Sequence, residues 1–558
     1  MSEETNLEAD IMTPPATTRR PRSVEDDEEE GSRSIDVKIV GMKSESEISE
    51  EYEEYEDKPS NGEVMGWCFY ELSSYFTHTV LLTIVFPLII SQTFGSDPPE
   101  PARGWYMNGK GFACSKKETL LFEALTYARV KVGSMKFSAL EWTSISWFFG
   151  LIVAAPLLAS VSIHLDHRRN PHMIAGFATA IGALFCLPAG AIKTVWIMPP
   201  YVAAIVASNA VGSAFHNRHL GLMVRGFVGA TIRKLQFPDR QAVSSWLSLY
   251  ATAGGCLGSA AIASFTYYML RNQEGFISLW VVSIFSGILW FAGIAHILTA
   301  TRSNGNKSPN SNTTVPGSHF VSIFKFPHAA GSLVGVFLSS FSTMSIFAGG
   351  LLYIVGQLCV PPKDLLFVWL TYFFFPLFVL PLLQPIQKLI RSDAVKMQIF
   401  GFLLSTLTSG MGFYHRHESW HNGHVLFLAA AQSIAAGVLH AYSRILLMDC
   451  APAGKEGAFA SWFSWVRMLG AFVGFAIGSS GTGANINRSF GGAFAAAVIG
   501  IVALVFSNVS SYGGAVAAGH VHKRRETGSP VPVRGSNDVV SAKGKGDSED
   551  GQDRSMEV

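Results

Sequence analysis

The stretch Ser244–Ser248 (SSWLS) is echoed 462 − 246 = 216 residues later by Ala460–Ser464 (ASWFS). Both copies are followed by glycines at the same spacing, namely Gly254 and Gly258 in the first copy and Gly470 and Gly474 in the second. Each copy comes after a polar turn and opens a long apolar run. The same helix therefore occurs once in each half of the chain, which is typical of a duplicated membrane transporter.

The composition supports a membrane protein. Of 558 residues 49% are hydrophobic and only 15% are charged, and this excludes a single soluble domain. Apolar runs of the roughly 20 residues needed to cross a bilayer recur along the chain. They predict twelve transmembrane helices in two pseudo-symmetric sets of six: 65–92, 139–163, 172–193, 199–219, 241–268 and 275–299, then 328–357, 364–387, 395–414, 424–447, 457–479 and 490–518.

The regions outside the apolar runs are polar. Acidic runs near the start and a Gly, Ser, Lys and Asp-rich stretch at the end predict disordered tails. No signal peptide opens the chain, so we expect the first span to direct membrane insertion. The predicted organisation is a tail (1–63), a six-helix bundle (64–300), a connector (301–326), a second six-helix bundle (327–519) and a second tail (520–558).

The distribution of Lys and Arg predicts the orientation. One face of the predicted bundle collects most of the Lys and Arg residues that lie near span ends, and the positive-inside rule assigns that face to the cytosol. The long loop 93–138 departs from this rule with five lysines. With an even number of spans, both tails and the connector are expected in the cytosol.

The six cysteines are too few for a disulfide framework. Cys114 and Cys359 fall in loops on the predicted non-cytosolic side, one in each half, so a disulfide between the halves is one expectation and two free thiols the other.

Arg467 is the most informative polar residue inside a predicted span. It lies about ten residues into its helix, roughly 15 Å deep. A charged side chain at that depth costs about 2.5–3.5 kcal/mol on insertion scales, so it needs a function or a partner. A guanidinium offers two parallel hydrogen bonds to a carboxylate. Arg467 either binds an anionic substrate group or forms a permanent ion pair that ties two helices together.

The first span carries two further titratable residues. Glu71 and His78 are seven residues apart and therefore share a helix face. Glu71 is a candidate proton carrier because burial raises a carboxyl pKa, and His78 is a candidate relay. For both, a paired or hydrogen-bonded structural role is the alternative. Tyr70 and Trp462 are candidate lining residues of a substrate cavity, although aromatic residues in membrane helices commonly serve as packing or interface anchors.

Charged clusters at the predicted cytosolic ends of the spans are candidates for gating. Asp166 with Arg168 and Arg169 can latch one conformation by pairing with neighbouring helix ends, or can be a simple positive-inside turn. His216 and Arg218 at the end of the fourth span are matched by Arg444 near the end of the tenth. This repetition argues against accident. The residues either form polar contacts between helices at a cytosolic gate, which we favour, or contact substrate that leaves the cavity.

Three motifs resemble the major facilitator superfamily, and within it the branch of the autophagy-related vacuolar amino-acid effluxers and their bacterial relatives. Gly66–Glu71 (GWCFYE) is similar to the opening of their first helix. Asp166–Arg169 (DHRR) is similar to their loop after helix two. Ala441–Arg444 (AYSR), followed by Pro452–Glu456 (PAGKE), is similar to their stretch between helices ten and eleven and is the most specific match.

This resemblance implies twelve helices in two bundles that rock around a central cavity. It implies a secondary transporter, not an enzyme, that exports amino acids from the vacuole or a related acidic compartment in a proton-linked way. The alternatives are another solute (a sugar, a nucleoside or an organic acid) and a non-transporting receptor or scaffold. We expect a small-molecule substrate and a lipid bilayer as partners, no nucleic acid, no cofactor, no metal and a monomeric protein. The vacuolar membrane is the expected location and the plasma membrane the alternative.

Overall fold

The computed structural model describes residues 57–94, 122–126, 130–167, 170–189, 194–272, 277–300, 316–356, 358, 360, 362–416, 420–480, 486–507 and 509–521. Most of the two predicted tails and residues 301–315 of the predicted connector lie outside these ranges. So do four residues singled out in the sequence, Cys114, Arg168, Arg169 and Cys359.

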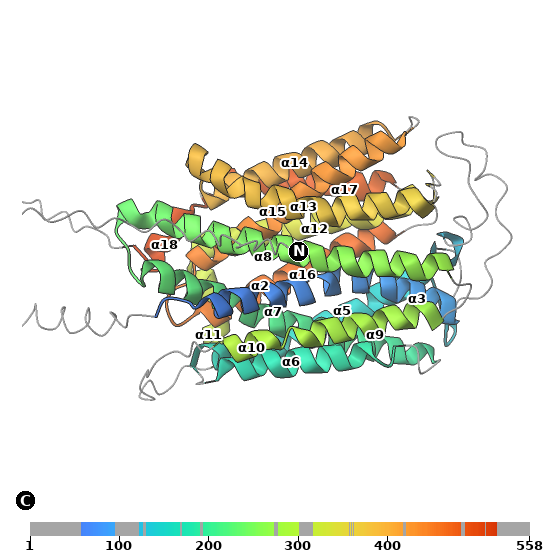
Figure 1. Ribbon diagram of the computed structural model, residues 1–558, viewed down its shortest axis with the longest axis horizontal. Coiled ribbons are helices and arrows are strands. Elements are labelled where there is room, and N and C mark those ends of the chain that lie inside the picture. The colour runs from blue at the N-terminus through green and yellow to red at the C-terminus, as the bar shows by residue number, and fades with distance from the viewer. Residues whose placement is uncertain are drawn as a thin grey trace, which may run out of the picture. The chain divides into compact units, whose positions relative to one another are not determined.

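The first half of the described chain is helical apart from one β-hairpin (Figure 1). Its first span consists of α2 (Asn61–Ser74), a π-helix η1 (Thr77–Val85) and α3 (Phe86–Phe94). The hairpin pairs β1 (Val130–Val132) with β2 (Met135–Phe137) in antiparallel register. The remaining elements are α5 (Ala139–His167), α6 (Pro171–Cys186), η3 (Val195–Ile197), α7 (Met198–Val228), η4 (Lys234–Gln236), α8 (Phe237–Asn272), α9 (Ile277–Ala292) and α10 (Ala295–Thr299).

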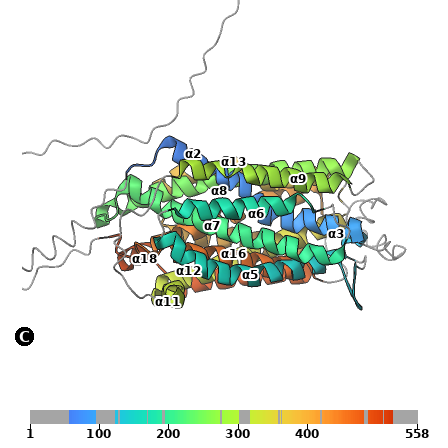
Figure 2. The ribbon, with the colours of Figure 1, turned by 90° about the horizontal axis from the view of Figure 1, so that it is seen from below.

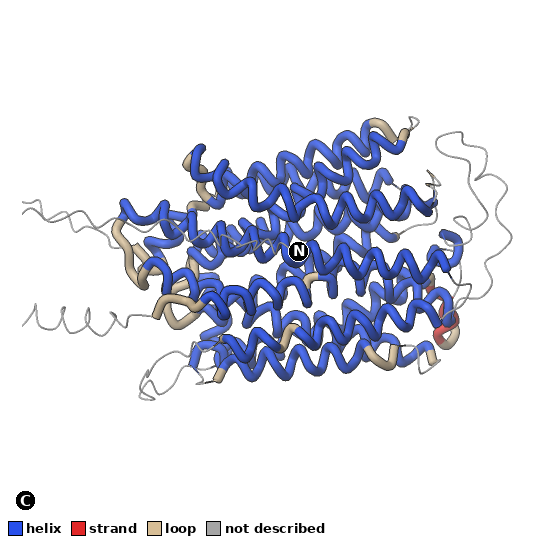
Figure 3. Tube along the Cα trace, in the orientation of Figure 1, coloured by secondary structure: helices blue, strands red, loops and turns tan. Residues whose placement is uncertain are grey.

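The second half repeats this sequence of long helices. After the short elements α11 (Pro316–Val321) and η5 (Ser322–Lys325), the long helices are α12 (Pro327–Gly356), α13 (Pro362–Ile390), α14 (Ala394–Tyr414), α15 (Asn422–Asp449), α16 (Glu456–Ser479) and α17 (Ile486–Phe506). A short helix, α18 (Ser511–Ala517), follows. It lies at the same end of the helices as the start of α2, and the β-hairpin lies at the opposite end (Figures 1 and 3). These are called the α18 end and the hairpin end below.

Ten helical segments of the described chain are long and apolar enough to cross a membrane. Helix α6, with 16 residues, is a shorter apolar helix, and α14 has 21 residues, so that every predicted span has a helix in its place. Two predicted spans end earlier than expected. The third ends at Cys186, and the predicted span 490–518 is divided into α17, which ends at Phe506, and the separate α18. The apolar run continued there, but Ser510 begins a new helix by accepting a hydrogen bond from Gly513 N at 3.1 Å.

The echoed sequence stretches occupy equivalent places in the two halves. In α8, Gly258 faces the carbonyl oxygen of Leu72, and in α16, Gly474 faces that of Phe341, so closely that a Cβ at either glycine would clash with the oxygen. The two glycines are 474 − 258 = 216 residues apart, which is the offset of the echoed stretches. The two carbonyl groups, on the first helix of each half, are 341 − 72 = 269 residues apart. Glycine thus lets the fifth helix of each half approach the first helix of the same half, which is a common device in membrane helix packing.

The two halves meet along α5 with α16 and α8 with α13, while α7 contacts α16 and α15 contacts α8. Figure 2 shows α5 beside α16. The echoed serines join the halves in the same way. Ser248 Oγ donates to the carbonyl oxygen of Ala441 on α15 at 3.0 Å, and Ser464 Oγ donates to that of Ala210 on α7 at 2.7 Å. The duplication seen in the sequence is therefore also a duplication of contacts.

Candidate functional site

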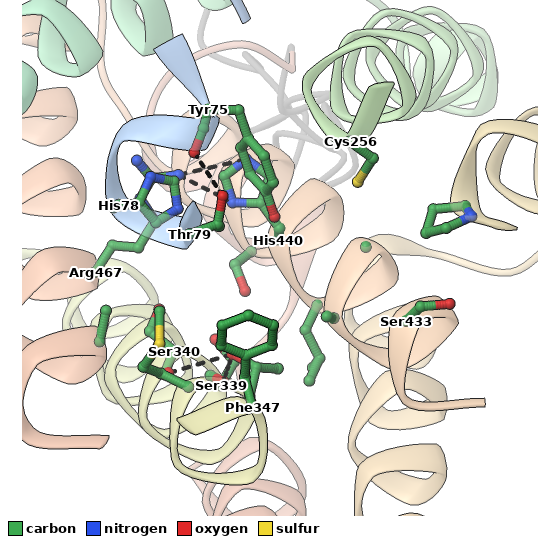
Figure 4. Close-up of a pocket in the computed structure, with 18 of the residues that line it drawn as sticks. Tyr75, His78, Thr79, Cys256, Ser339, Ser340, Phe347, Ser433, His440 and Arg467 are labelled. Carbon is green, nitrogen blue, oxygen red and sulfur yellow. Dashed lines mark hydrogen bonds between the residues drawn. The ribbon is translucent and has the colours of Figure 1, made fainter. Parts of the chain in front are cut away.

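A pocket lies between the two halves, near the middle of the long helices. Tyr75, His78 and Thr79 of the first span and Cys256 of α8 line it from the first half. Helices α12, α13, α15 and α16 line it from the second half, with Ser339, Ser340, Thr343, Phe347, Tyr372, Phe373, Ser433, His440, Ser443 and Arg467 among the lining residues. Figure 4 shows the basic side chains and Tyr75 together on one side and Ser339, Ser340 and Phe347 on the opposite side.

The π-helix η1 positions the part of the first span that reaches this pocket. His78 and Thr79 are its second and third residues. Thr79 Oγ1 donates to the carbonyl oxygen of Tyr75 at 3.0 Å and lies 3.0 Å from Ser259 Oγ. The ring of Tyr75 meets those of His78 and His440 edge-on, with centroids 4.9 and 5.1 Å apart. Irregular backbone of this kind is frequent at functional sites in membrane helices.

Arg467 is the cation of the pocket. Its side chain is buried, and Nη1 donates to His440 Nδ1 at 3.1 Å. Among the described residues its Nε hydrogen has no partner, and no carboxylate lies within ion-pair distance of this guanidinium. The arrangement therefore holds Arg467 through a neutral partner and leaves guanidinium hydrogens available at the pocket wall. A carboxylate placed there would accept charge-assisted hydrogen bonds.

Glu71 is the centre of a buried network next to the pocket. His440 Nε2 lies 3.0 Å from Oε1, while Arg444 Nη1 donates to Oε2 at 3.3 Å and His216 Nε2 lies 2.6 Å from the same oxygen. When His440 Nδ1 accepts from Arg467, its Nε2 carries the hydrogen that is donated to Glu71. The carboxylate of the first half is thus tied to two side chains of α15 in the second half and, through His440, to Arg467.

Arg444 differs from Arg467 because each of its three guanidinium nitrogens donates a hydrogen bond. Its Nη2 donates to the carbonyl oxygen of Ser248 at 3.1 Å and to Thr252 Oγ1 at 3.3 Å, and Nε donates to Ser248 Oγ at 3.1 Å. Its guanidinium also lies over the ring of Trp67, 5.2 Å from the centroid. A cation held by this many partners is a fixed counter-charge for Glu71, and it leaves Arg467 as the arginine suited to a ligand.

Asp166, at the end of α5, caps the start of α16 across the two halves. Its Oδ1 accepts from Gly457 N at 2.6 Å and its Oδ2 from Ala458 N at 3.1 Å. His319 Nε2 lies 3.0 Å from Oδ2, and Arg218 Nε lies 3.6 Å from Oδ1. A carboxylate at a helix N-terminus satisfies orphan N–H groups and interacts favourably with the helix dipole. The contact closes the α18 end of the α5–α16 pair.

Two ion pairs flank this cap and mirror each other with reversed charge. Arg240 on α8 donates to Asp449 on α15 at 3.2 Å, and Glu456 on α16 accepts from Arg225 on α7. Arg240 and Glu456 are equivalent by the sequence offset, since 240 + 216 = 456. Ser511 of α18 donates to the second oxygen of Asp449 at 2.6 Å. The α18 end is therefore held together by buried charges from both halves.

Two predicted cavity residues lie elsewhere. Tyr70 is buried against the rings of His216 and His296, with centroids 4.9 and 5.7 Å away, and does not line the pocket. Trp462 stacks on Phe320 at 4.7 Å, and its Nε1 donates to the carbonyl oxygen of the same residue. Among the described residues no group of three His, Cys, Asp or Glu side chains is placed to hold a metal ion.

Sequence reasoning missed the residues of the two mirrored ion pairs and the buried His296. The signal for one pair was present, because the offset of 216 that aligns the SSWLS and ASWFS stretches also aligns Arg240 with Glu456. Opposite charges at equivalent positions suggest partners of opposite charge in the facing half. His296 carried no such signal.

Comparisons with known proteins identify the fold. A solved structure described as a bacterial homologue of the iron transporter ferroportin, in an outward-facing state, matches 80% of this chain and 99% of its own, with a TM-score of 0.51 and 13% sequence identity. No family model and no curated protein matches the chain. The structural likeness confirms the predicted fold class, an all-α membrane protein with a fold like that of the major facilitator superfamily.

Proposed function

We propose that this protein is a secondary active transporter that moves a small carboxylate-bearing solute by alternating access. The observation that carries the proposal is the pocket between the two halves, with Arg467 buried at its wall and without a carboxylate partner among the described residues. Burying a cation is costly unless something pairs with it, so a substrate carboxylate is the natural partner. The finer proposal is amino-acid efflux from a vacuole or a related acidic compartment, supported by the three sequence motifs.

The rest of the pocket fits a small polar solute with an apolar part. Ser339 and Ser340 offer hydroxyl groups on the side opposite Arg467, where Phe347 offers aromatic surface (Figure 4). Thr343 and Tyr372 line the same pocket. A few convergent polar groups in a largely apolar wall are typical of small-molecule sites. The substrate carboxylate would face Arg467, and its remaining groups would face the hydroxyl and aromatic side.

Glu71 provides a means of coupling to protons. As a carboxylate it holds His440 and Arg444 of the opposite half. Protonation would remove its charge, weaken both contacts and release His440, the partner of Arg467. One proton would thus change the contact between the halves and the surroundings of the substrate-binding arginine together, which is the differential interaction that coupling requires.

Asp166 and its neighbours would act as the latch of the α18 end. The latch holds while Asp166 caps α16 and the flanking ion pairs are made. We assign the α18 end to the cytosol on the basis of the Lys and Arg distribution. Arg168 and Arg169 would belong to the same latch. Release of the cap would open the pocket toward the cytosol.

The test is transport by the purified protein in proteoliposomes, measured with a mixed pool of radiolabelled amino acids, with and without a pH gradient. Gradient-dependent movement of the label supports the proposal. Arg467→Ala should abolish carboxylate transport, and Arg467→Lys, which keeps the charge but loses the bidentate geometry, should retain a part of it. A folded wild-type protein that moves no amino acid would overturn the amino-acid assignment.

The alternatives give different results in the same system. A neutral cargo such as a sugar or a nucleoside would still be moved by the Arg467→Ala variant. A receptor or scaffold would lose its activity when residues 1–60 are deleted, whereas a transporter would keep its flux. The Arg444→Lys variant serves as a comparison, because it perturbs an arginine that is already fully hydrogen-bonded and does not line the pocket.

A further inference from the structure

A row of buried titratable side chains runs along α2 from the α18 end to the pocket. Glu63 Oε1, in the first turn of α2, lies 2.9 Å from His219 Nε2 on α7. The His219 ring lies 5.2 Å from that of His296 on α10, measured between centroids, and the His296 ring lies 5.9 Å from that of His216. His216 Nε2 lies 2.6 Å from Glu71, which continues to His440 at the pocket.

His296 is the member of this row that packing alone does not explain. Its side chain is 0% exposed, and within the described part of the chain neither ring nitrogen has a hydrogen-bond partner. A buried polar group without a partner costs about 1–3 kcal/mol, so each one in a folded protein requires a reason. Both of its neighbours in the row, His219 and His216, meet it edge-on, with interplanar angles of 78° and 80°. This places it between two other imidazoles.

The two ends of the row have different surroundings. Glu63 is buried, but the three residues before it, Ser60 to Gly62, are exposed, so the helix start is open within one turn of its carboxylate. His440 lines the pocket between the halves and accepts a hydrogen bond from Arg467. The row therefore connects an exposed helix start with the wall of the proposed substrate site.

We propose that Glu63, His219, His296 and His216 form a proton path between the α18 end and Glu71. A proton taken up by the Glu63 carboxylate passes to His219, then to His296 and His216, and reaches the Glu71 carboxylate, leaving each donor in its starting charge state. Imidazole suits this task because one ring nitrogen can accept a proton while the other releases one. Among the described residues His296 makes no hydrogen bond to His219 or His216, so each of the two steps through it requires a bridging water. The path rests on the proposed proton-linked transport.

The side chains around the row include two arginines near its pocket end, together with thiols, phenols and an imidazole. Glu71 faces the fixed cation of Arg444, and Arg467 lies beyond His440. Within the described part of the chain, the other titratable groups near the row are Cys68 and Tyr70 on α2, Tyr75 and His78 in the first span and Cys256 on α8. These neighbours are thiols, phenols and one further imidazole, so Glu63 and Glu71 are the carboxylates at the two ends of the path.

The experiment compares two transport modes of the full-length protein in proteoliposomes, with the mixed radiolabelled amino-acid pool as the probe. Accumulation driven by a pH gradient requires net proton movement, whereas counterflow, the exchange of labelled for unlabelled amino acids without a gradient, does not. His296→Gln keeps a polar side chain but cannot carry a proton. We expect gradient-driven accumulation to fall at least tenfold and counterflow to stay within twofold of wild type.

His219→Gln tests a second step of the path and should give the same pattern. His172→Gln, which changes a half-buried histidine of α6 outside the row, is the matched control and should leave both modes unchanged. Retention of gradient-driven accumulation by both His296→Gln and His219→Gln would overturn the path while the proposed function stands. Equal loss of both modes would also overturn it, by making these histidines structural. A wild-type protein that is inactive in both modes would instead overturn the proposed function.

Discussion

The two ends of the α5–α16 helix pair are joined by opposite kinds of contact. At the α18 end, Asp166 accepts from two backbone N–H groups of α16 and lies beside His319 and Arg218. At the hairpin end, the fully buried Trp147 of α5 packs against Phe475 of α16, with centroids 5.7 Å apart. The same two helices are therefore closed by charge at one end and by aromatic packing at the other.

This difference indicates which end is the more readily switched. Charged groups that separate can be taken over by water, so opening replaces protein contacts by hydration. Aromatic surface that separates in contact with water loses about 25 cal/mol per Å² without any replacement. The α18 end is thus the more readily switched of the two, and four predictions test this comparison.

The largest effect is expected from Asp166→Ala. The substitution leaves the start of α16 uncapped and Arg218 without its carboxylate neighbour, and removing one partner from a buried charged cluster costs about 3–5 kcal/mol. The population with an open α18 end should rise accordingly. The measurement is labelling of Cys256, which lines the pocket, by a membrane-impermeant maleimide added from the α18 side, in a variant whose other five cysteines are serine.

Two variants make this measurement specific. Asp166→Glu keeps the charge and should restore slow labelling in part. Labelling from the hairpin side should fall, not rise, if the two ends open alternately. Unchanged labelling from the α18 side in Asp166→Ala would show that the cap does not hold this end closed.

A smaller effect is expected for the mirrored ion pairs. Arg240→Gln or Asp449→Asn alone leaves a buried charge unpaired and should favour the open α18 end by about 2–3 kcal/mol, while the double variant should cost less than the sum. The same Cys256 labelling in a double-mutant cycle measures this coupling. Additive effects would mean that the two residues act separately, and the comparison of the ends would then rest on Asp166 alone.

The sequence predicted the architecture because the architecture depends on simple patterns. Length and hydropathy locate the spans, and the repeated SSWLS and ASWFS stretches with their glycines relate α8 to α16. The boundaries near the α18 end were less predictable. The fourth predicted span stops at His219, yet α7 continues to Val228, because Arg225 near its end is buried by its contact with Glu456. A tertiary contact of this kind has no local sequence signal.

The candidate site was predictable residue by residue but not as an arrangement. Arg467, Glu71 and His78 stand out because charge is rare within an apolar span, and the structure brings all three to the pocket or its immediate network. Every guanidinium nitrogen of Arg444 donates a hydrogen bond, and this depends on Ser248 and Thr252 of another helix, α8. The sequence therefore does not show how Arg444 differs from Arg467. Tyr70 and Trp462 show the converse, since an aromatic residue next to a polar motif does not reveal which way it faces.

A pH effect should distinguish the two ends further. His520, after α18, is 3% exposed, and burial, with a contribution from the nearby Arg240 and Arg225, holds its pKa well below the usual 6.5. The segment that contains His520 is docked against Ile232 and Ala451. When it is released, His520 binds a proton below about pH 6.5, and when it is docked it does not. The docked state is therefore destabilised as the pH falls, by roughly 1.4 kcal/mol for each pH unit below 6.5. The Ile232 amide donates to the His520 carbonyl. After correction for intrinsic rates, its hydrogen exchange should be about tenfold faster at pH 5.5 than at pH 7.

The control for this pH effect is His520→Gln, which should show the same corrected exchange at pH 7 and pH 5.5. Amides near Trp147 at the hairpin end, where the α5–α16 contact is aromatic, should also be insensitive to this change of pH. A pH response of equal size at both ends would assign the effect to the whole protein and not to the docking of the segment that contains His520.

The smallest effect is expected from Trp147→Phe, and its small size is the point of the test. The indole nitrogen of Trp147 is buried and has no hydrogen-bond partner among the residues that the structure describes, so only the apolar surface of the ring contributes to the contact with Phe475. Phenylalanine keeps most of the apolar contact and removes the unsatisfied N–H group, so the gain and the loss should cancel to within about 0.5 kcal/mol. Labelling of Cys256 from the hairpin side should therefore change less than threefold. A much larger increase would mean that the indole N–H finds a partner when this end is closed, and the hairpin end would then be polar in function as well.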